Sequence, residues 1–297
     1  MDASALCGIH PILYAFFDRD NRLDRDAMRR QVQVVIDAGA PGVAVLGLAT
    51  EVNKLSDAER RQLINWTAQD VAGRVPLAVT IAGDSVDAQL ELANYAVAHG
   101  ADWLILQPPA QRGQPEAFYF DFFSSVMADL RVPVGIQNAP EYLGVGLGPD
   151  AIVRLAQRHP QFRMLKGEGP AVIIGRTIKR VGSRLQVFNG RGGMELVDNL
   201  RAGCAGLIVA PDCFDYQVAA YEHFRRGEVE QAEAVYREIL PAIVFVMQSL
   251  DTLVCYGKRI AAWRMGLHEV FDRAPALPPT ALGLAAVRRF ADSLGRF

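Results

Sequence analysis

The sequence has no strong excess of charge of either sign. Its 31 lysines and arginines nearly balance 33 acidic residues, which leaves a net charge of −2 at pH 7. Without a basic run, nothing in the sequence predicts binding to nucleic acid or to an anionic membrane surface. The sequence contains no run of 18 apolar residues, so no transmembrane helix is predicted. The opening residues MDASALCGIHP have neither the basic nor the apolar region of a signal peptide, so we expect a cytoplasmic protein.

Residues that commonly bind metals are few and scattered. The five histidines show no H-E-x-x-H spacing and the cysteines show no C-x-x-C spacing, so no metal site is predicted. Reduced thiols in the cytoplasm are the simplest interpretation of the four cysteines, which are Cys7, Cys204, Cys213 and Cys255.

Short apolar runs and longer amphipathic segments alternate through the first two thirds of the 297 residues. Eight such runs predict a parallel sheet that closes into a (β/α)8 TIM barrel, an α/β fold of about 250 residues. An open, doubly wound sheet is the alternative, but no G-x-G-x-x-G follows the first strand. The eight predicted strands are 10–16, 42–47, 75–82, 102–107, 132–136, 162–166, 185–188 and 206–210.

The alternation of apolar runs and amphipathic segments ends near residue 212, and from there the pattern predicts only helices. We therefore expect a barrel over residues 1–211 and a C-terminal helical bundle over 212–297. Pro241 is expected to kink or split a helix over 228–255. The apolar residues of this bundle fit either packing on the barrel or a subunit interface. The other helices predicted here are 214–226, 258–265 and 279–294.

Lys166 stands out at the end of the sixth predicted strand, FRMLK, directly before Gly167. An unpaired ammonium is costly to bury, so a lysine there either forms an ion pair, extends to solvent or has a lowered pKa. A neutral lysine attacks carbonyl carbons and forms a Schiff base. The pattern alone leaves open the alternative of a rim lysine paired with Glu168 or Glu51.

Several motifs occur in the order and spacing of one known family. PILYAFF opens the first strand, and GVAVLGLATEVNKLSDAER, IQNAP, FRMLKGEGP, VFNGRGG, AGCAGLIV and GKRIAAWRMGL follow. Over essentially its full length the chain resembles the dihydrodipicolinate synthase/N-acetylneuraminate lyase family. The resemblance implies that Lys166 is the Schiff-base lysine, that no metal or organic cofactor is needed, and that the protein forms a homo-oligomer, either a dimer or a tetramer.

The first departure from the family concerns the carboxylate-binding turn. Leu48 and Ala49 replace a pair of threonines that hold the carboxylate of the 2-oxo acid. The backbone N–H groups of Ala49 and Thr50 could still bind this carboxylate, and Thr50 adds a hydroxyl.

The second departure concerns proton transfer. Gln137 occupies the position of the family's relay tyrosine, and an amide cannot titrate in its place. The second relay tyrosine falls near Pro109 and Ala110 and is missing, while Tyr142 replaces an arginine that binds the second substrate of the synthases. Dihydrodipicolinate synthase activity itself is therefore not expected. Tyr14 could supply a phenol to the same mouth, with a packed core tyrosine as the alternative.

We expect a lyase that forms a Schiff base with a small-molecule 2-oxo acid, such as pyruvate or a keto-deoxy sugar acid. The enzyme would act as an aldolase on a carbon–carbon bond or as a dehydratase on a carbon–oxygen bond. The alternative is a catalytically weakened family member that binds a small oxo acid as a sensor or scaffold. The predicted catalytic residues are Lys166, Gln137 and Tyr14. The predicted substrate-binding residues are Leu48, Ala49, Thr50, Asn138, Tyr142, Asn189, Gly190, Arg191 and Ile208.

Overall fold

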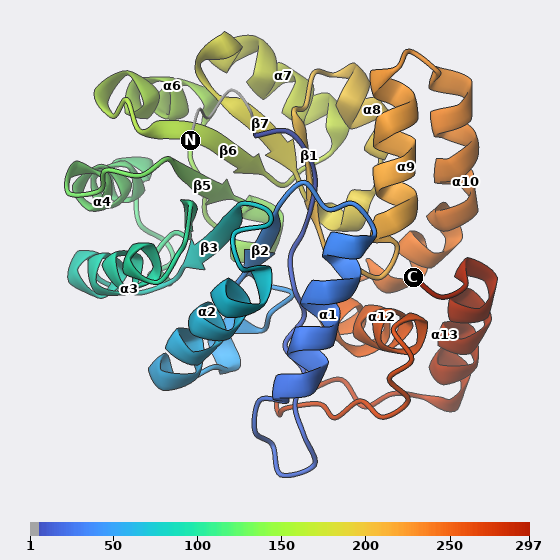
Figure 1. Ribbon diagram of the computed structural model, residues 1–297. Coiled ribbons are helices and arrows are strands. Elements are labelled where there is room, and N and C mark those ends of the chain that lie inside the picture. Colours follow the sequence, from blue (N-terminus) through green and yellow to red (C-terminus); the bar gives the residue numbers. More distant parts are fainter. Residues whose placement is uncertain (1–5) are drawn as a thin grey trace.

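The computed structural model describes residues 6–297, and its centre is a barrel of eight parallel strands (Figure 1). Neighbouring strands follow the order β1-β8-β7-β6-β5-β4-β3-β2. A parallel bridge between Ile12 and Ala44 joins the two ends of this order and closes the barrel. The fold predicted from the sequence is confirmed. The strands are β1 (Gly8–Pro11), β2 (Val43–Val45), β3 (Leu77–Ile81), β4 (Trp103–Leu106), β5 (Val134–Asn138), β6 (Phe162–Gly167), β7 (Gln186–Asn189) and β8 (Gly206–Val209).

Nearly all residues of the strands are buried, which explains why the strands are mostly apolar in the sequence. All five residues of β3, LAVTI, are buried, as are all four of β4, WLIL. Alternate side chains of a strand point to opposite faces, so one set fills the barrel and the other packs under the surrounding helices.

The helices surround the barrel, and their starts follow local sequence signals (Figure 1). Ser56 and Glu59 form a capping box at the start of α2, and the Asp24 side chain accepts hydrogen bonds at the start of α1. The helices that cover the first seven strands are α1 (Arg25–Asp37), α2 (Asp57–Val71), α3 (Val86–Ala98), α4 (Glu116–Ala128), α6 (Pro149–Arg158), α7 (Ala171–Val181) and α8 (Leu196–Arg201). Short helical turns are η2 (Val52–Lys54), α5 (Pro140–Leu143), η3 (Gly182–Arg184) and η4 (Arg191–Gly193).

Helix α9 (Phe214–Arg225) completes the eighth strand–helix unit, although it lies beyond residue 211, where we expected the barrel to end. It packs against β1, α8 and α10 (Val229–Val246), and Figure 1 shows α9 and α10 as an antiparallel pair beside the barrel. The helix that follows β8 therefore packs on the neighbouring strand β1.

The remaining chain is helical, as predicted, but it breaks at a different place. Of the two outcomes expected at Pro241, a kink or a split, the split is wrong, because α10 continues through this proline to Val246. The chain turns instead at 247–249, where Ser249 caps a new helix through the Thr252 N–H. The later elements are α11 (Leu250–Thr252), the π-helical turn η5 (Leu253–Gly257), α12 (Lys258–Arg264) and α13 (Ala281–Leu294).

Within residues 6–297, no single helix combines the length and apolar character needed to cross a membrane. Only the pair Val229–Val246 and Leu250–Arg264 meets these criteria together, and it is bent by 111°. Over the same residues, no group of three histidine, cysteine or acidic side chains is arranged to hold a metal ion.

Candidate active site

Lys166 is the last residue but one of β6, at the carboxyl end of the barrel. Its neighbours in the sheet are Gln137 of β5 and Phe188 of β7. The lysine is 5% exposed. Lys166 therefore lies where TIM barrels carry their catalytic residues, as the sequence predicted.

Glu168 follows two residues later and forms an ion pair with Lys166. Its Oε1 lies 3.0 Å from Lys166 Nζ, and both side chains are buried. Residues two apart in an extended chain share a face, which places both charges on the inside of the barrel. The Glu168 N–H donates to the Asn138 carbonyl oxygen at 3.0 Å and continues the sheet for one more residue. The sequence left open a free amine or a paired one, and the structure shows the pair.

A chain of glutamine amides holds the other oxygen of Glu168. Gln137 Nε2 donates to Glu168 Oε2 at 2.7 Å, and Gln107 Nε2 donates to Gln137 Oε1 at 2.8 Å. Gln89 Nε2 in turn donates to the Gln107 carbonyl oxygen at 2.8 Å. All four side chains are buried. The carboxylate therefore has one oxygen fixed by an amide while the other faces the lysine.

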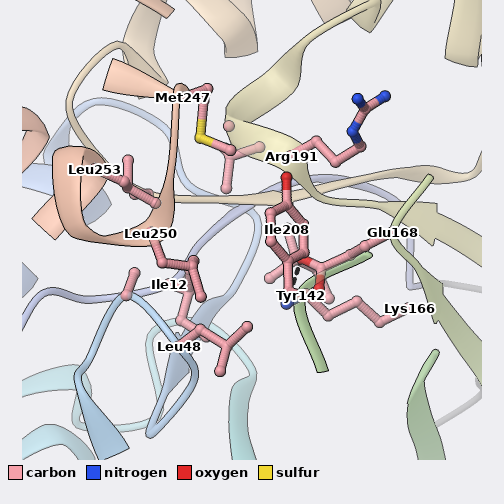
Figure 2. A pocket seen from close by; sticks show the side chains of 14 residues that line it. Ile12, Leu48, Tyr142, Lys166, Glu168, Arg191, Ile208, Met247, Leu250 and Leu253 are labelled. Atoms are coloured by element: carbon pink, nitrogen blue, oxygen red, sulfur yellow. Dashed lines mark ion pairs between the residues drawn. The ribbon is translucent and has the colours of Figure 1, made fainter. Parts of the chain in front are cut away.

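A small pocket with about 30 Å³ of free volume opens beside Lys166 and Glu168. Figure 2 shows apolar side chains gathered on one side of it and Lys166, Glu168 and Arg191 on the other. The lining residues are Ile12, Leu48, Ala49, Tyr142, Lys166, Glu168, Arg191, Gly192, Ile208, Val209, Ala210, Met247, Leu250 and Leu253.

Arg191 and Tyr142 are the remaining polar side chains of the lining. Arg191 has a left-handed backbone (φ 53°), and its Nη1 lies 3.0 Å from Glu195 Oε2. Its Nε is buried without a hydrogen-bond partner among the described residues, 3.4 Å from Glu141 Oε2. Burial raises the pKa of Tyr142, and the nearby Glu168 carboxylate raises it further. Both side chains can offer hydrogen-bond donors to a ligand.

The turn after β2 offers fewer hydrogen-bond donors to a ligand than the sequence suggested. Leu48 and Ala49 line the pocket. The hydroxyl of Thr50, however, donates to the Leu13 carbonyl oxygen at 2.6 Å, and its N–H donates to the Gly47 carbonyl oxygen at 3.0 Å. Thr50 therefore holds the turn against the first strand, and the Ala49 N–H is the donor left to meet a ligand.

Tyr14 lies in the core. It is fully buried, and its hydroxyl donates to Asp212 Oδ1 at 3.0 Å. Burial raises the pKa of Asp212 to about 6. Tyr14 is not among the residues that line the pocket. The alternative left open by the sequence, a packed core tyrosine, describes this residue.

Two predicted asparagines form contacts within the protein. The Asn138 side chain donates to the Leu147 carbonyl oxygen at 3.0 Å and accepts from the Leu147 N–H at 2.7 Å. The buried Asn189 side chain donates to the Gly169 carbonyl oxygen at 2.9 Å. Gly190 leaves room for Glu168, because a Cβ at this position would lie 2.2 Å from Glu168 Oε1. These residues shape the site without lining the pocket.

Two groups of pocket residues were not predicted from the sequence. Glu168 was considered only as a partner that would neutralise Lys166, although the Lys-x-Glu spacing at a strand end places both side chains on one face. Met247, Leu250 and Leu253 come from the chain that follows α10 and close the apolar side of the pocket (Figure 2). Their contact with the site depends on the turn at 247–249, for which the sequence has no strong signal.

The chain is similar in sequence and in fold to several known proteins. A probable 2-dehydro-3-deoxy-D-pentonate aldolase, YjhH of Escherichia coli K12, is 28% identical over 84% of this chain and 85% of its own. The L-2-keto-3-deoxyarabonate dehydratase of Azospirillum brasilense is 29% identical over 80% and 78%. Among solved structures, one similar protein is YagE of E. coli K12, a prophage protein of the dihydrodipicolinic acid synthase family determined in complex with pyruvate. It superposes on this chain with a TM-score of 0.90 at 22% identity, and the match covers 98% of this chain and 99% of YagE.

The family resemblance inferred from the motifs is therefore confirmed. Residues 5–290 match the family described as the dihydrodipicolinate synthetase family, and the relatives named above are lyase-type enzymes. The chain belongs to the dihydrodipicolinate synthetase family.

Proposed function

We propose that the protein is a lyase that forms a Schiff base between Lys166 and the ketone of a small 2-oxo acid. The observation that carries this proposal is the position of the Lys166 amine, at the end of a barrel strand and on the wall of a small pocket. An iminium at this amine withdraws electrons from the substrate and supports cleavage of a carbon–carbon bond or loss of water. The named functions of the relatives, aldolase and dehydratase, are of this kind.

The pocket offers a place for each end of such a substrate. The Ala49 N–H is a donor for the carboxylate beside the ketone. Arg191 and Tyr142 supply donors for a polar group further along the substrate, while Met247, Leu250 and Leu253 exclude water from the apolar side. A larger adjoining cleft with about 540 Å³ of free volume shares Leu48, Tyr142 and Leu250 with the pocket and gives room for substrates longer than pyruvate.

Borohydride trapping tests the proposal directly. The protein is incubated with pyruvate and with keto-deoxy sugar acids, reduced, digested and analysed by mass spectrometry. We expect a covalent adduct on Lys166 that is absent from Lys166→Ala and present in the surface control Lys179→Ala. If no 2-oxo acid labels Lys166 at millimolar concentration, the Schiff-base function is wrong. Adduct formation without turnover of any of these acids would instead favour the sensor or scaffold alternative.

The proposal includes the cytoplasmic, homo-oligomeric state expected from the sequence. All four cysteines are free thiols in the structure, which fits a reducing compartment. Light scattering on the purified protein would measure the number of subunits.

A further inference from the structure

We propose that Glu168 is the acid–base residue of the reaction and carries the protons that a tyrosine would otherwise relay. This inference rests on the proposed Schiff-base function and adds a catalytic residue to it. Glu168 contacts the reacting atom itself, since its Oε1 lies 3.0 Å from Lys166 Nζ.

Among the residues that line the pocket, Glu168 is the only carboxylate. Tyr142 is the only phenol, and burial raises its pKa, so it holds its proton at neutral pH. Gln137 has no proton to exchange, because an amide does not titrate. Of the groups on the pocket wall, Glu168 is therefore the one that can both accept and return a proton at the lysine.

The surrounding residues orient this carboxylate for such a role. Gln137 donates to Oε2 and leaves Oε1 facing the amine. Gln107 donates a hydrogen bond to Gln137 and fixes its amide, so the two glutamines together hold the Glu168 carboxylate in one position. Gln137 is then a positioning residue.

The protein also leaves space for the carboxylate. A Cβ at position 190 would lie 2.2 Å from Glu168 Oε1 and 2.9 Å from its Cδ. Glycine at the end of β7 therefore lets Glu168 fold back over the strand end towards Lys166.

The proton transfers balance with Glu168 as the only carrier. Glu168 takes a proton from the lysine ammonium, and the neutral amine forms a bond to the ketone carbon while the carbonyl π-bond breaks. Glu168 returns this proton to the resulting alkoxide to give a carbinolamine. It next takes a proton from the nitrogen and delivers it to the hydroxyl, which leaves as water as the iminium forms. The carboxylate is regenerated and can then remove a proton from C3 to give the enamine.

Two measurements on pyruvate isolate these steps. The first is the rate of adduct formation on Lys166, followed by borohydride quenching at successive times. The second is the exchange of the C3 protons for deuterium, followed by NMR. In Glu168→Gln we expect adduct on Lys166 after long incubation, with both rates reduced about 10²-fold or more. The matched control is Glu91→Gln, a carboxylate-to-amide change in an exposed ion pair with Arg61, which should leave both rates unchanged.

Two further variants separate acid–base chemistry from a structural role. Glu168→Asp keeps a carboxylate about 1.5 Å further from the amine. We therefore expect C3 proton exchange to be slow in this variant but faster than in Glu168→Gln. If Glu168→Gln does not fold, the same two rates are measured on Glu168→Asp instead. Formate should restore part of the rate in Glu168→Ala.

Wild-type rates in Glu168→Gln would overturn the role of Glu168 while the Schiff-base function stands. Equal losses in the Gln and Asp variants without rescue by formate would also overturn it and indicate a structural role. If wild-type protein forms no adduct with any 2-oxo acid, both this inference and the proposed function fail.

Discussion

The carboxylate of Glu168 lies 3.0 Å from the amine of Lys166, and both side chains are almost completely removed from solvent. A buried ion pair of this kind is stable only when both partners are present, because either charge alone would be buried without compensation. The same contact allows direct proton transfer between the two groups. The pair is therefore a structural element of the barrel mouth and the centre of the proposed chemistry.

The stability of this pair is testable by a double-mutant cycle. We expect Lys166→Met to lower the free energy of unfolding by about 3 kcal/mol at pH 7, because Glu168 is left buried without its partner. The double variant Lys166→Met/Glu168→Met should be more stable than the single variant, since no charge remains. Urea unfolding measures both values. Additive losses in the double variant would show that the two side chains are not energetically coupled.

Gly190→Ala should disturb the site by steric overlap. The added methyl group would overlap Glu168 Oε1 and push the carboxylate away from Lys166. We expect C3 proton exchange of pyruvate to fall at least about 10-fold, as a displacement of about 1 Å costs up to about 10²-fold.

The matched control for that change is Gly175→Ala in α7, where the nearest atom to the new methyl group is the Ala202 Cβ at 3.4 Å. This variant should keep the exchange rate and gain about 0.5–1 kcal/mol of stability, because alanine is the better helix former. Equal activity in the two glycine variants would argue against a need for space at residue 190.

Thr50→Val should lower stability more than activity. The change removes the donor to the buried Leu13 carbonyl oxygen, a loss of about 1–3 kcal/mol in the free energy of unfolding. Thr50→Ser keeps the hydroxyl and should stay close to wild type. Thermal unfolding and the pyruvate KM are measured on both. A large rise in KM with unchanged stability would instead assign the Thr50 hydroxyl to the substrate, as the sequence analysis allowed.

Asp212 makes stability depend on pH. Its pKa rises from 3.8 to about 6 in the folded protein because of burial. Between these values the folded state binds a proton that the unfolded state has lost, so the contribution of Asp212 to stability is present below pH 4 and lost as the pH rises through 6. Asp212→Asn cannot lose a proton. Relative to wild type it should therefore gain about 3 kcal/mol between pH 4 and pH 7. Chemical unfolding at both pH values checks this, and a constant difference would contradict it.

Much of the fold was predictable because local signals agreed with one another. Eight apolar runs separated by amphipathic helices admit few architectures, and a capping box such as that of Ser56 and Glu59 specifies a helix start without tertiary contacts. The course of the C-terminal chain was less predictable. Pro241 is tolerated inside α10, and the turn at 247–249 depends on how the helix meets the barrel mouth.

The sequence by itself determined that Lys166 stands at the end of the sixth strand, because strand periodicity and the following glycine are local properties. Only the tertiary structure decided which groups surround its amine. Glu168, Gln137 and Gln107 come from three neighbouring strand ends, and Gly190 comes from a fourth. Their distances depend on barrel closure and on the register of each pair of strands, which no single segment encodes.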